Sequence, residues 1–324
     1  MRAVVTGITG QDGYYMAALL LERDFEVLGL TSKEGAPRLD LSARFPDHFR
    51  MTLFDYGTPL RIGELLAEYR PSHIFNFAAK ATGEGMFNDP YRLTRLNGGF
   101  AIDILEALRK SDRREQMVFC QASSSEMFGK VSETPQSEST ALWPQSPYGA
   151  AKLYAHHMIG IYRRAYGVRC CSAILYNHES VRRSTSFVTK KIARAAAMIK
   201  LGLQDSLALG DLDAQRDWGY APEYVEAMYR MACADTMDDY IVATGRLTTV
   251  RQLCEIAFGH LDLKYTDYVR TNEVESRVAK SMSLQGDPRK IHAALGWNAS
   301  TSVGQIMVEL VEHELAQARA DARE

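Results

Sequence analysis

Short apolar runs alternate with helical patterns through the first half of this chain. The apolar runs have the length of single strands and lie at 3–7, 25–30, 49–55, 73–79 and 116–123. The helical patterns between them lie at 14–24, 60–70 and 98–110. Strands that alternate with helices form parallel sheets, and their crossover connections are right-handed. The pattern therefore predicts an α/β fold built on a parallel sheet.

A glycine-rich turn joins the first predicted strand to the first predicted helix. The segment VVTGITGQDGYY spaces Gly7, Gly10 and Gly13 as GxxGxxG. Glycines at this point let the backbone approach a pyrophosphate, which then sits on the helix N-terminus. A purely structural turn is the alternative, but the position between a strand and a helix favours a dinucleotide site. We therefore expect a Rossmann-type doubly wound parallel sheet that binds NAD(P).

The second half of the chain has a less regular pattern. A strand is predicted at 239–245, and helices are predicted at 189–202, 221–233, 249–261 and 302–324. We expect residues 1–176 to form the NAD(P)-binding domain, with returning segments near 211–245. Residues 177–324 are expected to form mainly a smaller, interleaved C-terminal α/β domain for the substrate.

Charge and cysteine content exclude several classes of protein. The 324 residues carry a formal net charge of −2, so nothing favours nucleic acid. No run reaches the ~18 apolar residues of a membrane span, and the N-terminus has no signal-peptide pattern. The five cysteines lack any metal-ligand spacing. We expect a cytoplasmic protein with reduced thiols, no bound metal, and no nucleic-acid or membrane partner.

The segment SPYGAAK carries a tyrosine and a lysine four residues apart. Ser146 can cap a helix and Pro147 suits its first position, which places Tyr148 and Lys152 on one helix face. A phenol is a poor base at neutral pH, and a nearby ammonium favours its phenolate. A surface Tyr–Lys pair is the alternative. Together with the glycine turn and the upstream serine run, the spacing favours a catalytic pair.

Five segments together resemble one enzyme superfamily. They are GITGQDGYY, QASSSEMFG, SPYGAAK, ILYNHES-VRR and DAQRDWGYAPEYV. They are similar to segments of the extended short-chain dehydrogenase/reductase superfamily. Within it they resemble the GDP-mannose 4,6-dehydratase family, from residue 2 to about residue 300. The segments NHES-RR and RDWG are far more specific than the glycine turn.

The resemblance implies catalytic roles for four residues. Ser124 matches the hydroxyl that hydrogen-bonds the sugar O4, and Tyr148 matches the base that removes the C4 hydroxyl proton. Lys152 matches the residue that tunes Tyr148 and holds the nicotinamide ribose. Glu126 matches the acid–base residue of the dehydratase branch. It would remove the C5 proton after C4 oxidation and protonate the departing C6 hydroxyl, and the hydride would return to C6.

The glycine turn and the resemblance together imply a cofactor site. Thr31, Ser32 and Lys33 stand where an acid would bind a ribose 2′-OH, so NADP is favoured over NAD. Asp55 either hydrogen-bonds the adenine amine or closes a turn. The expected cofactor-binding residues are Gly7, Thr9, Gly10, Gln11, Asp12, Gly13, Thr31, Ser32, Lys33, Asp55, Tyr56, Ala78, Tyr148 and Lys152.

Arginines and the NHES segment imply a nucleotide-diphosphate sugar, with a GDP-hexose as the substrate of the family. Guanidinium groups pair well with phosphates, although a surface salt bridge is the alternative for each arginine. Lys80 replaces a Ser-His segment of the family and either contacts the sugar or is solvated. The expected substrate-binding residues are Lys80, Asn177, Glu179, Ser180, Arg183, Val188, Lys191, Arg216, Arg270 and Glu273.

Two other functions stay open on the sequence. A nucleotide-sugar 4-epimerase or 4-ketoreductase would share the Ser, Tyr and Lys but not Glu126, whereas a non-catalytic NAD(P)-binding regulator would not need them. The helix bearing Lys152 has apolar side chains on more than one face, which favours burial against a partner helix. We therefore expect a homodimer or homotetramer, with His156 and His157 in packing or interface positions.

Overall fold

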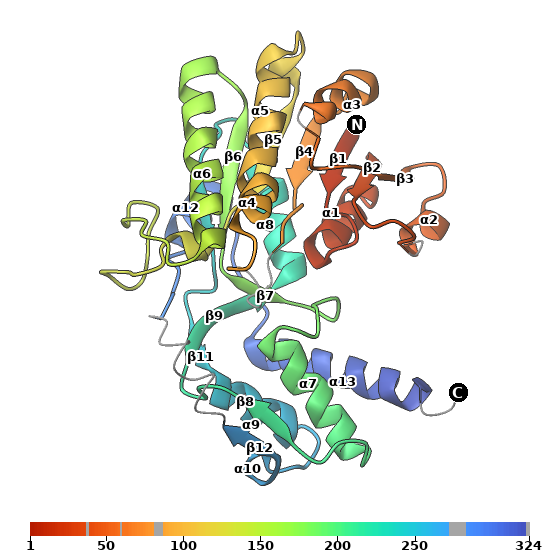
Figure 1. The fold of residues 1–324 in the computed structure, drawn as a ribbon, viewed down its shortest axis with the longest axis vertical. Helices are drawn as coiled ribbons and strands as arrows, with labels where there is room; N and C mark the ends of the chain where they lie inside the picture. Colours follow the sequence, from red (N-terminus) through yellow and green to blue (C-terminus); the bar gives the residue numbers. More distant parts are fainter. Residues whose placement is uncertain (37–38, 59, 81–86, 272–282, 322–324) are drawn as a thin grey trace.

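A seven-stranded parallel sheet forms the larger part of the molecule (Figure 1). The structure is a computed structural model that describes residues 1–36, 39–58, 60–80, 87–271 and 283–321. The strand order is β10-β6-β5-β4-β1-β2-β3, with all neighbours parallel. The strands are β1 (Arg2–Thr6), β2 (Glu26–Thr31), β3 (Phe49–Leu53), β4 (His73–Asn76), β5 (Val118–Ala122), β6 (Cys170–Leu175) and β10 (Tyr240–Val242).

Helices cover both faces of this sheet, so the predicted doubly wound fold is confirmed. One face packs against α3 (Arg61–Tyr69), α5 (Phe100–Lys110) and α6 (Pro147–Tyr166). The other face packs against α1 (Gln11–Leu21), α8 (Ala221–Cys233) and α12 (Arg289–Leu295). Successive residues of each strand point to opposite faces, which is why nearly continuous apolar runs form these strands.

Two predicted elements differ at their ends for visible reasons. The fourth strand stops at Asn76, because the amides of Phe77 and Ala78 donate to the Thr6 hydroxyl at 3.1 and 3.0 Å instead of a neighbouring strand. The helix predicted at 98–110 is preceded by α4 (Pro90–Thr94) and a π-helical turn, η1 (Arg95–Gly99). Such π turns re-aim side chains and are frequent at functional sites.

The smaller part of the molecule has its own apolar core (Figure 1). A three-stranded sheet pairs β11, β9 and β7, and a two-stranded sheet pairs β12 with β8. The helices pack around a core centred on Ile192, Leu253 and Leu310. The elements are β7 (Asn177–Glu179), β8 (Leu207–Leu209), β9 (Gln215–Tyr220), β11 (Leu247–Thr249), β12 (Val269–Thr271), α7 (Val188–Lys200), α9 (Val250–Gly259), α10 (Tyr265–Tyr268) and α13 (Val303–Asp321).

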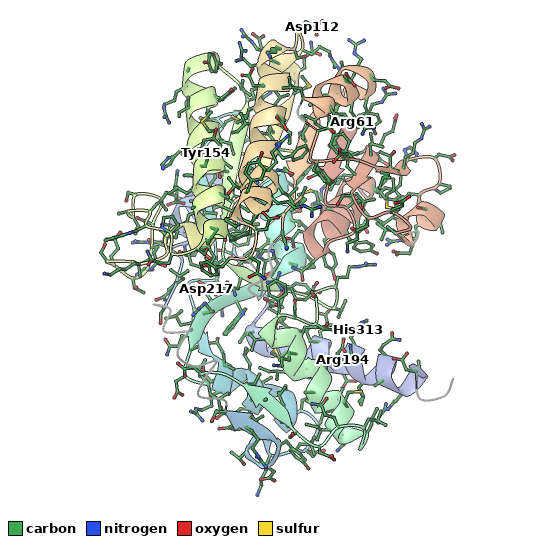
Figure 2. All side chains as sticks on the ribbon, in the orientation of Figure 1. Arg61, Asp112, Tyr154, Arg194, Asp217 and His313 are labelled. Carbon is green, nitrogen blue, oxygen red and sulfur yellow. The ribbon has the colours of Figure 1, made fainter. Side chains whose placement is uncertain are left out.

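The chain passes between the two parts several times, and Asp217 lies at this junction (Figure 2). Its buried carboxylate accepts hydrogen bonds from the amide and hydroxyl of Thr244 and from the amides of Gly245 and Gly286. A buried carboxylate is tolerated only when it is hydrogen-bonded in this way. Asp217 therefore joins β9 to two later segments that return toward the large sheet.

Two further sequence expectations concern cysteines and membranes. All five cysteines are free, and four of them are buried. Across the described ranges, none of the helices combines the length and apolar character needed to cross a membrane.

Candidate active site

A cleft of about 580 Å³ opens at the carboxyl ends of the central strands. Open parallel sheets bind ligands at this edge, where the strand order reverses between β1 and β4. The β1–α1 turn, the segments after β4, β5 and β6, and the start of α6 all contribute lining residues. Most of the predicted catalytic and cofactor residues therefore meet in one place.

The glycine turn has a geometry that only glycine satisfies. Gly7 has a φ of +65°, and a Cβ on Gly7 would lie 2.8 Å from the carbonyl carbon of Phe77. A Cβ on Gly13 would lie 2.4 Å from the Gly7 oxygen. Backbone amides therefore border the cleft at the start of α1, as a pyrophosphate requires.

The predicted cofactor residues divide into those that line the cleft and those that support it. Thr9, Gly10, Gln11, Asp12, Lys33, Tyr148 and Lys152 line it. Tyr56 does not: its buried hydroxyl accepts from the Gly7 amide at 3.1 Å and donates to the Leu30 oxygen at 2.8 Å. Ala78 is also buried, with its amide on Thr6. Tyr56 and Ala78 therefore support the backbone around the glycine turn, and a direct contact of either residue with the cofactor stays a prediction.

The loop after β2 and the end of β3 form a second, smaller pocket of about 180 Å³. Thr31 and Lys33 line it, and Ser32 beside them is exposed. The Thr31 hydroxyl accepts from the Lys33 amide at 3.2 Å, which orients the loop. Asp55 accepts from the Gly57 amide and the Thr58 hydroxyl at 2.8 and 2.6 Å, so the geometry favours its turn role.

Helix α6 presents Tyr148 and Lys152 to the cleft. The Ser146 hydroxyl accepts from the Gly149 amide at 3.0 Å and Pro147 occupies the first turn, as the sequence predicted. The Lys152 Nζ lies 5.8 Å from the centre of the Tyr148 ring. Four-residue spacing on a helix explains this proximity.

Burial shifts the pKa values of Tyr148 and Lys152 in opposite directions. Burial raises the pKa of Tyr148 to about 12, and the Glu126 charge adds to this, whereas the Ser124 hydrogen bond and the Arg183 charge lower it. Burial also lowers the pKa of Lys152 to about 8, against the opposing charge of Asp12. Pairs of titratable groups with opposed shifts in a cleft are typical of acid–base sites.

A buried chain of hydrogen bonds holds Lys152, and the sequence did not predict it. The Lys152 Nζ donates to the Ala122 oxygen at 2.7 Å, and the Gln121 amide donates to the same oxygen at 2.7 Å. The Gln121 oxygen in turn accepts from Asn76 at 2.7 Å, and Asn76 accepts from the Thr6 hydroxyl at 2.5 Å. Amides inside apolar strands were the available signal, because a buried amide needs partners.

The serine run after β5 forms a short 3₁₀ turn, η3 (Ser125–Met127). The Ser124 hydroxyl caps this turn by accepting from the Glu126 amide at 3.2 Å. The turn brings Glu126 into the cleft, half-buried beside Tyr148. Burial lowers the pKa of Arg216, and the charge of Glu126 opposes this, so the two side chains are close enough to interact. Ser124, Glu126 and Tyr148 thus meet in one cleft.

Only part of the NHES segment lines the cleft. Asn177 lines the cleft, but Glu179 and Ser180 are each only 1% exposed. Glu179 accepts from the Thr189 hydroxyl at 2.5 Å and pairs with the Arg183 Nε at 3.2 Å. The buried Glu179 therefore positions Arg183 at the cleft, and direct substrate contact of Glu179 and Ser180 stays a prediction.

The remaining predicted substrate residues are not all gathered at the cleft. Lys80 has an exposed side chain outside the cleft lining, and Asn97 holds its amide at 2.9 Å and its carbonyl at 3.2 Å. Lys191 is exposed on α7, and Val188 begins that helix against the smaller core. The exposed Arg270 donates to the carbonyls of Thr266, Val269 and Asp267. Glu273 lies outside the described residues.

Several lining residues were missed by the sequence interpretation. They include Phe77, Leu175, His178, Arg182 and Phe187. The guanidinium of Arg182 lies 3.2 Å from the centre of the Tyr14 ring, and that of Arg183 lies 3.6 Å from the Phe187 ring. The NHES-VRR motif was recognised, but only its contacts show which of its members reach the cleft.

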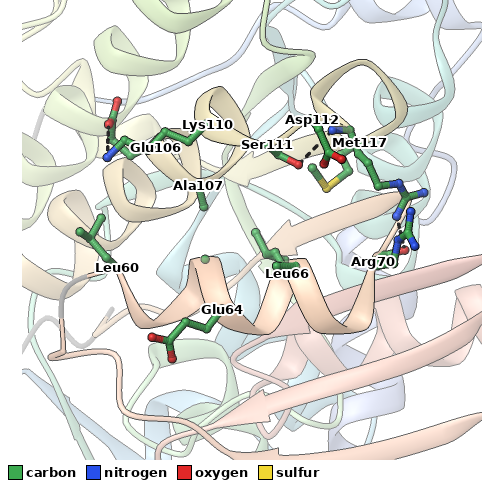
Figure 3. Close-up of a pocket in the computed structure, with 13 residues that line it drawn as sticks. Leu60, Glu64, Leu66, Arg70, Glu106, Ala107, Lys110, Ser111, Asp112 and Met117 are labelled. Atoms are coloured by element: carbon green, nitrogen blue, oxygen red, sulfur yellow. Dashed lines mark hydrogen bonds and ion pairs between the residues drawn. The ribbon is translucent and has the colours of Figure 1, made fainter.

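A larger cavity of about 720 Å³ lies between α3 and α5, at the amino ends of β4 and β5 (Figure 3). Part of its charged lining is already engaged: Glu106 pairs with Arg109 and Lys110, and Arg113 donates to the Arg70 carbonyl. No nucleophile and base face each other there among the residues that the structure describes. Size alone therefore does not mark the candidate active site, and the cleft of about 580 Å³ is the one that Glu126, Tyr148 and Lys152 line.

Comparison with known proteins supplies independent information on the family. The family model described as GDP-mannose 4,6 dehydratase matches residues 4–310. A GDP-mannose 4,6 dehydratase 2 of Arabidopsis thaliana is 38% identical over 98% of this chain and 88% of its own length. The GDP-mannose 4,6-dehydratase of Yersinia enterocolitica is 35% identical over 99% of this chain and 95% of its own length.

Solved structures with lower identity share the fold. A dTDP-glucose 4,6-dehydratase from Bacillus anthracis, in complex with NAD, has a TM-score of 0.82 at 18% identity and covers 99% of this chain and 98% of its own. RMD from Pseudomonas aeruginosa, complexed with NADPH, has a TM-score of 0.77 at 23% identity and covers 98% of this chain and 99% of its own.

Burial of Lys152 predicts a pH-dependent difference in stability. Its pKa is about 8 in the folded protein, below the value near 10.4 in an unfolded chain. Between these values the unfolded chain binds more protons, so the free energy of unfolding rises with pH, by up to about 3 kcal/mol. Lys152→Met should therefore be more stable than wild type at pH 7, and this difference should shrink as pH rises from about 8 to 10.

Urea unfolding at several pH values measures this difference. Lys264→Met is the control, because Lys264 is exposed, and its difference from wild type should not depend on pH. A Lys152→Met difference that stays constant over the same range would contradict the placement of a charged lysine in a buried site.

Proposed function

Because this chain belongs to the GDP-mannose 4,6-dehydratase family, we propose that it converts GDP-mannose, or a closely related GDP-hexose, to the 4-keto-6-deoxy sugar. The observation that carries the proposal is the meeting of Ser124, Glu126 and Tyr148 in one cleft beside Lys152. Epimerases and ketoreductases do not need the carboxylate. Residues 1–176 would hold the cofactor, and residues 177–324 mainly the nucleotide sugar.

The cleft fits an NAD(P) cofactor. The glycine turn leaves no room for side chains next to the start of α1, where backbone amides are available to a pyrophosphate. Lys152, with its ammonium held by the Ala122 oxygen, would bind the nicotinamide ribose. Lys33, in the small pocket after β2, would meet a 2′-phosphate, which favours NADP. When bound, such a cofactor accepts the C4 hydride and returns it to C6.

Two residues would act directly on the C4 hydroxyl. Tyr148 takes its proton, and Ser124 holds the same oxygen by a hydrogen bond. Burial raises the pKa of Tyr148, and the charge of Arg183 opposes this. The Lys152 ammonium, 5.8 Å from the centre of the Tyr148 ring, would also favour the ionised phenol. Neutralising charges in a site of low dielectric have large effects, so this arrangement suits proton transfer at neutral pH.

Glu126 would then carry out the elimination. A ketone at C4 acidifies the C5 hydrogen, and the Glu126 carboxylate removes that proton. The same proton is delivered to the C6 hydroxyl, so the C6–O bond breaks and one water leaves. One carboxylate serves as base and then as acid on neighbouring carbons. Arg216, whose guanidinium interacts electrostatically with the Glu126 carboxylate, would lie beside the same region of the cleft.

The role of Glu126 predicts the behaviour of one variant. Glu126→Gln keeps the cleft shape but removes the acid–base group, so formation of a product lighter by one water should fall by about 10²–10⁴-fold. Because Ser124, Tyr148 and Lys152 are unchanged, slow oxidation at C4 should persist. The measurement is mass spectrometry of products from GDP-mannose and NADP⁺.

The exposed Glu115 provides a matched control, and Glu115→Gln should dehydrate at the wild-type rate. Dehydration by Glu126→Gln at the wild-type rate would show that Glu126 is not the acid–base residue of the elimination. A wild-type product of unchanged mass but inverted C4 would point instead to a 4-epimerase.

The preference for NADP rests on Lys33 and is tested by binding. Lys33→Ala should weaken NADPH binding by about tenfold or more, because a hydrogen bond to a charged group is lost, and should leave NADH binding nearly unchanged. Fluorescence titration of both cofactors measures this, with Lys264→Ala as the control. Equal losses for the two cofactors would contradict a 2′-phosphate contact.

We also propose that the protein is a homodimer or a larger homo-oligomer. Large apolar side chains are exposed on α4 and α6: Tyr91 (85%), Tyr154 (47%) and Ile161 (42%). Tyr154 lies midway along α6 (Figure 2). Clusters of exposed aromatic and aliphatic side chains mark interaction surfaces more often than free surface.

Charge placed on this surface should disrupt the oligomer. Tyr154→Glu combined with Ile161→Lys should convert the protein to monomers, because a self-complementary interface would bury both new charges. Light scattering after gel filtration gives the mass. Leu203→Lys, at a residue 52% exposed in the smaller part, is the control and should not change the mass. A monomeric wild type would overturn the proposal.

A further inference from the structure

The first turn of α1 carries an acid where an anion is expected to sit. Asp12 lies in this turn, lines the cleft and keeps a side chain 22% exposed. A carboxylate is favourable near a helix N-terminus, but it repels a pyrophosphate bound at the same turn. Binding of a dinucleotide there therefore needs a cation that compensates Asp12.

His178 of β7 supplies that cation. Its Nδ1 lies 2.7 Å from the Tyr176 carbonyl oxygen, which can only accept, so Nδ1 carries a proton. Its Nε2 lies 3.0 Å from the Asp12 carboxylate, which also accepts. A histidine that donates from both nitrogens is an imidazolium. The ring also stacks on Tyr224 at 4.7 Å, an arrangement that favours a cation.

The charges around the pair agree with this protonation state. Burial lowers the pKa of His178, but the Asp12 charge and hydrogen bond outweigh it, and the net direction is upward despite Arg183. Burial raises the pKa of Asp12, but the charge and hydrogen bond of His178, the Gln11 hydrogen bond and, last, the charge of Arg183 lower it, and the net direction is downward. Burial lowers the pKa of Lys152 on α6, and the negative charge of Asp12 opposes this shift.

Further hydrogen bonds connect the pair to both parts of the molecule. The Gln11 amide donates to the Asp12 carboxylate and to the His178 carbonyl, both at 3.0 Å. The Ser180 hydroxyl donates to the Gln11 oxygen at 2.7 Å. The start of α1 and strand β7 are thereby held together, which accounts for the burial of Ser180.

We propose that His178 is a positioning residue whose imidazolium neutralises Asp12, so that the first turn of α1 accepts the cofactor pyrophosphate while β7 stays fixed against it. The inference rests on the proposed cofactor site. It does not depend on the sugar or on the elimination step. A double-mutant cycle measures the charge compensation between Asp12 and His178 directly.

The experiment is titration of the full-length protein with NADPH, followed by fluorescence, without any sugar. His178→Gln removes the cation that is hydrogen-bonded to Asp12 and should weaken binding by on the order of tenfold or more. Asp12→Asn removes the acid, and His178 then becomes neutral, so adding His178→Gln to this variant should cost at most about threefold in binding. The double variant Asp12→Asn/His178→Gln should therefore bind within about threefold of Asp12→Asn and more tightly than His178→Gln.

The double variant separates compensation from other roles of His178. If it binds as weakly as His178→Gln, the imidazole itself is what the cofactor needs, and the inference is overturned. Wild-type binding by His178→Gln would overturn it as well. If His178→Gln does not fold, a double variant that folds and binds within about threefold of Asp12→Asn still supports compensation, and a folded double variant that binds more weakly than this refutes it.

Two controls complete the test. His292→Gln, at an exposed histidine of α12, should bind NADPH like wild type. A wild-type protein that binds NADPH but does not dehydrate GDP-mannose would defeat the proposed function and leave this inference standing. A wild-type protein that binds neither NADPH nor NADH would defeat both.

Discussion

The site depends on one buried chain of hydrogen bonds that crosses three strands. It runs from Thr6 through Asn76 and Gln121 to the Ala122 carbonyl and ends at the Lys152 ammonium. Each buried polar atom in it has a partner, so the chain is rigid and specific. The same hydroxyl of Thr6 ends β4 and turns its backbone toward the cleft. Lys152 and the glycine turn are therefore placed by the sheet itself.

The buried charges at this site lower the stability of the fold and favour proton transfer. Lys152 and Tyr148 both have pKa values displaced by burial, and in opposite directions. Holding an ammonium in a dry pocket destabilises the folded chain, but it makes the same charge more effective on the neighbouring phenol. Asp12 and His178 follow the same logic, because two charges that are each costly alone become tolerable as a hydrogen-bonded pair.

The two parts of the molecule meet through polar residues rather than through a shared apolar core. Asp217 ties β9 to the returning segments, and Gln11 and Ser180 tie α1 to β7. Directional bonds of this kind define a relative orientation, whereas apolar contacts tolerate sliding. An orientation defined in this way lets Glu126 and Arg183, from segments far apart in the chain, line one cleft.

The order of strands and helices and the glycine turn were readable in the sequence, because both depend on short-range periodicity and spacing. The pairing of Tyr148 with Lys152 was readable for the same reason, and the family motifs indicated Ser124 and Glu126. The sequence could not show that Tyr56, Glu179 and Ser180 point away from the cleft, or that His178 points into it. Those outcomes depend on contacts between segments far apart in the chain, such as Gln11 with Ser180. Only the tertiary structure decides which polar side chains of a motif reach the ligand and which satisfy buried partners.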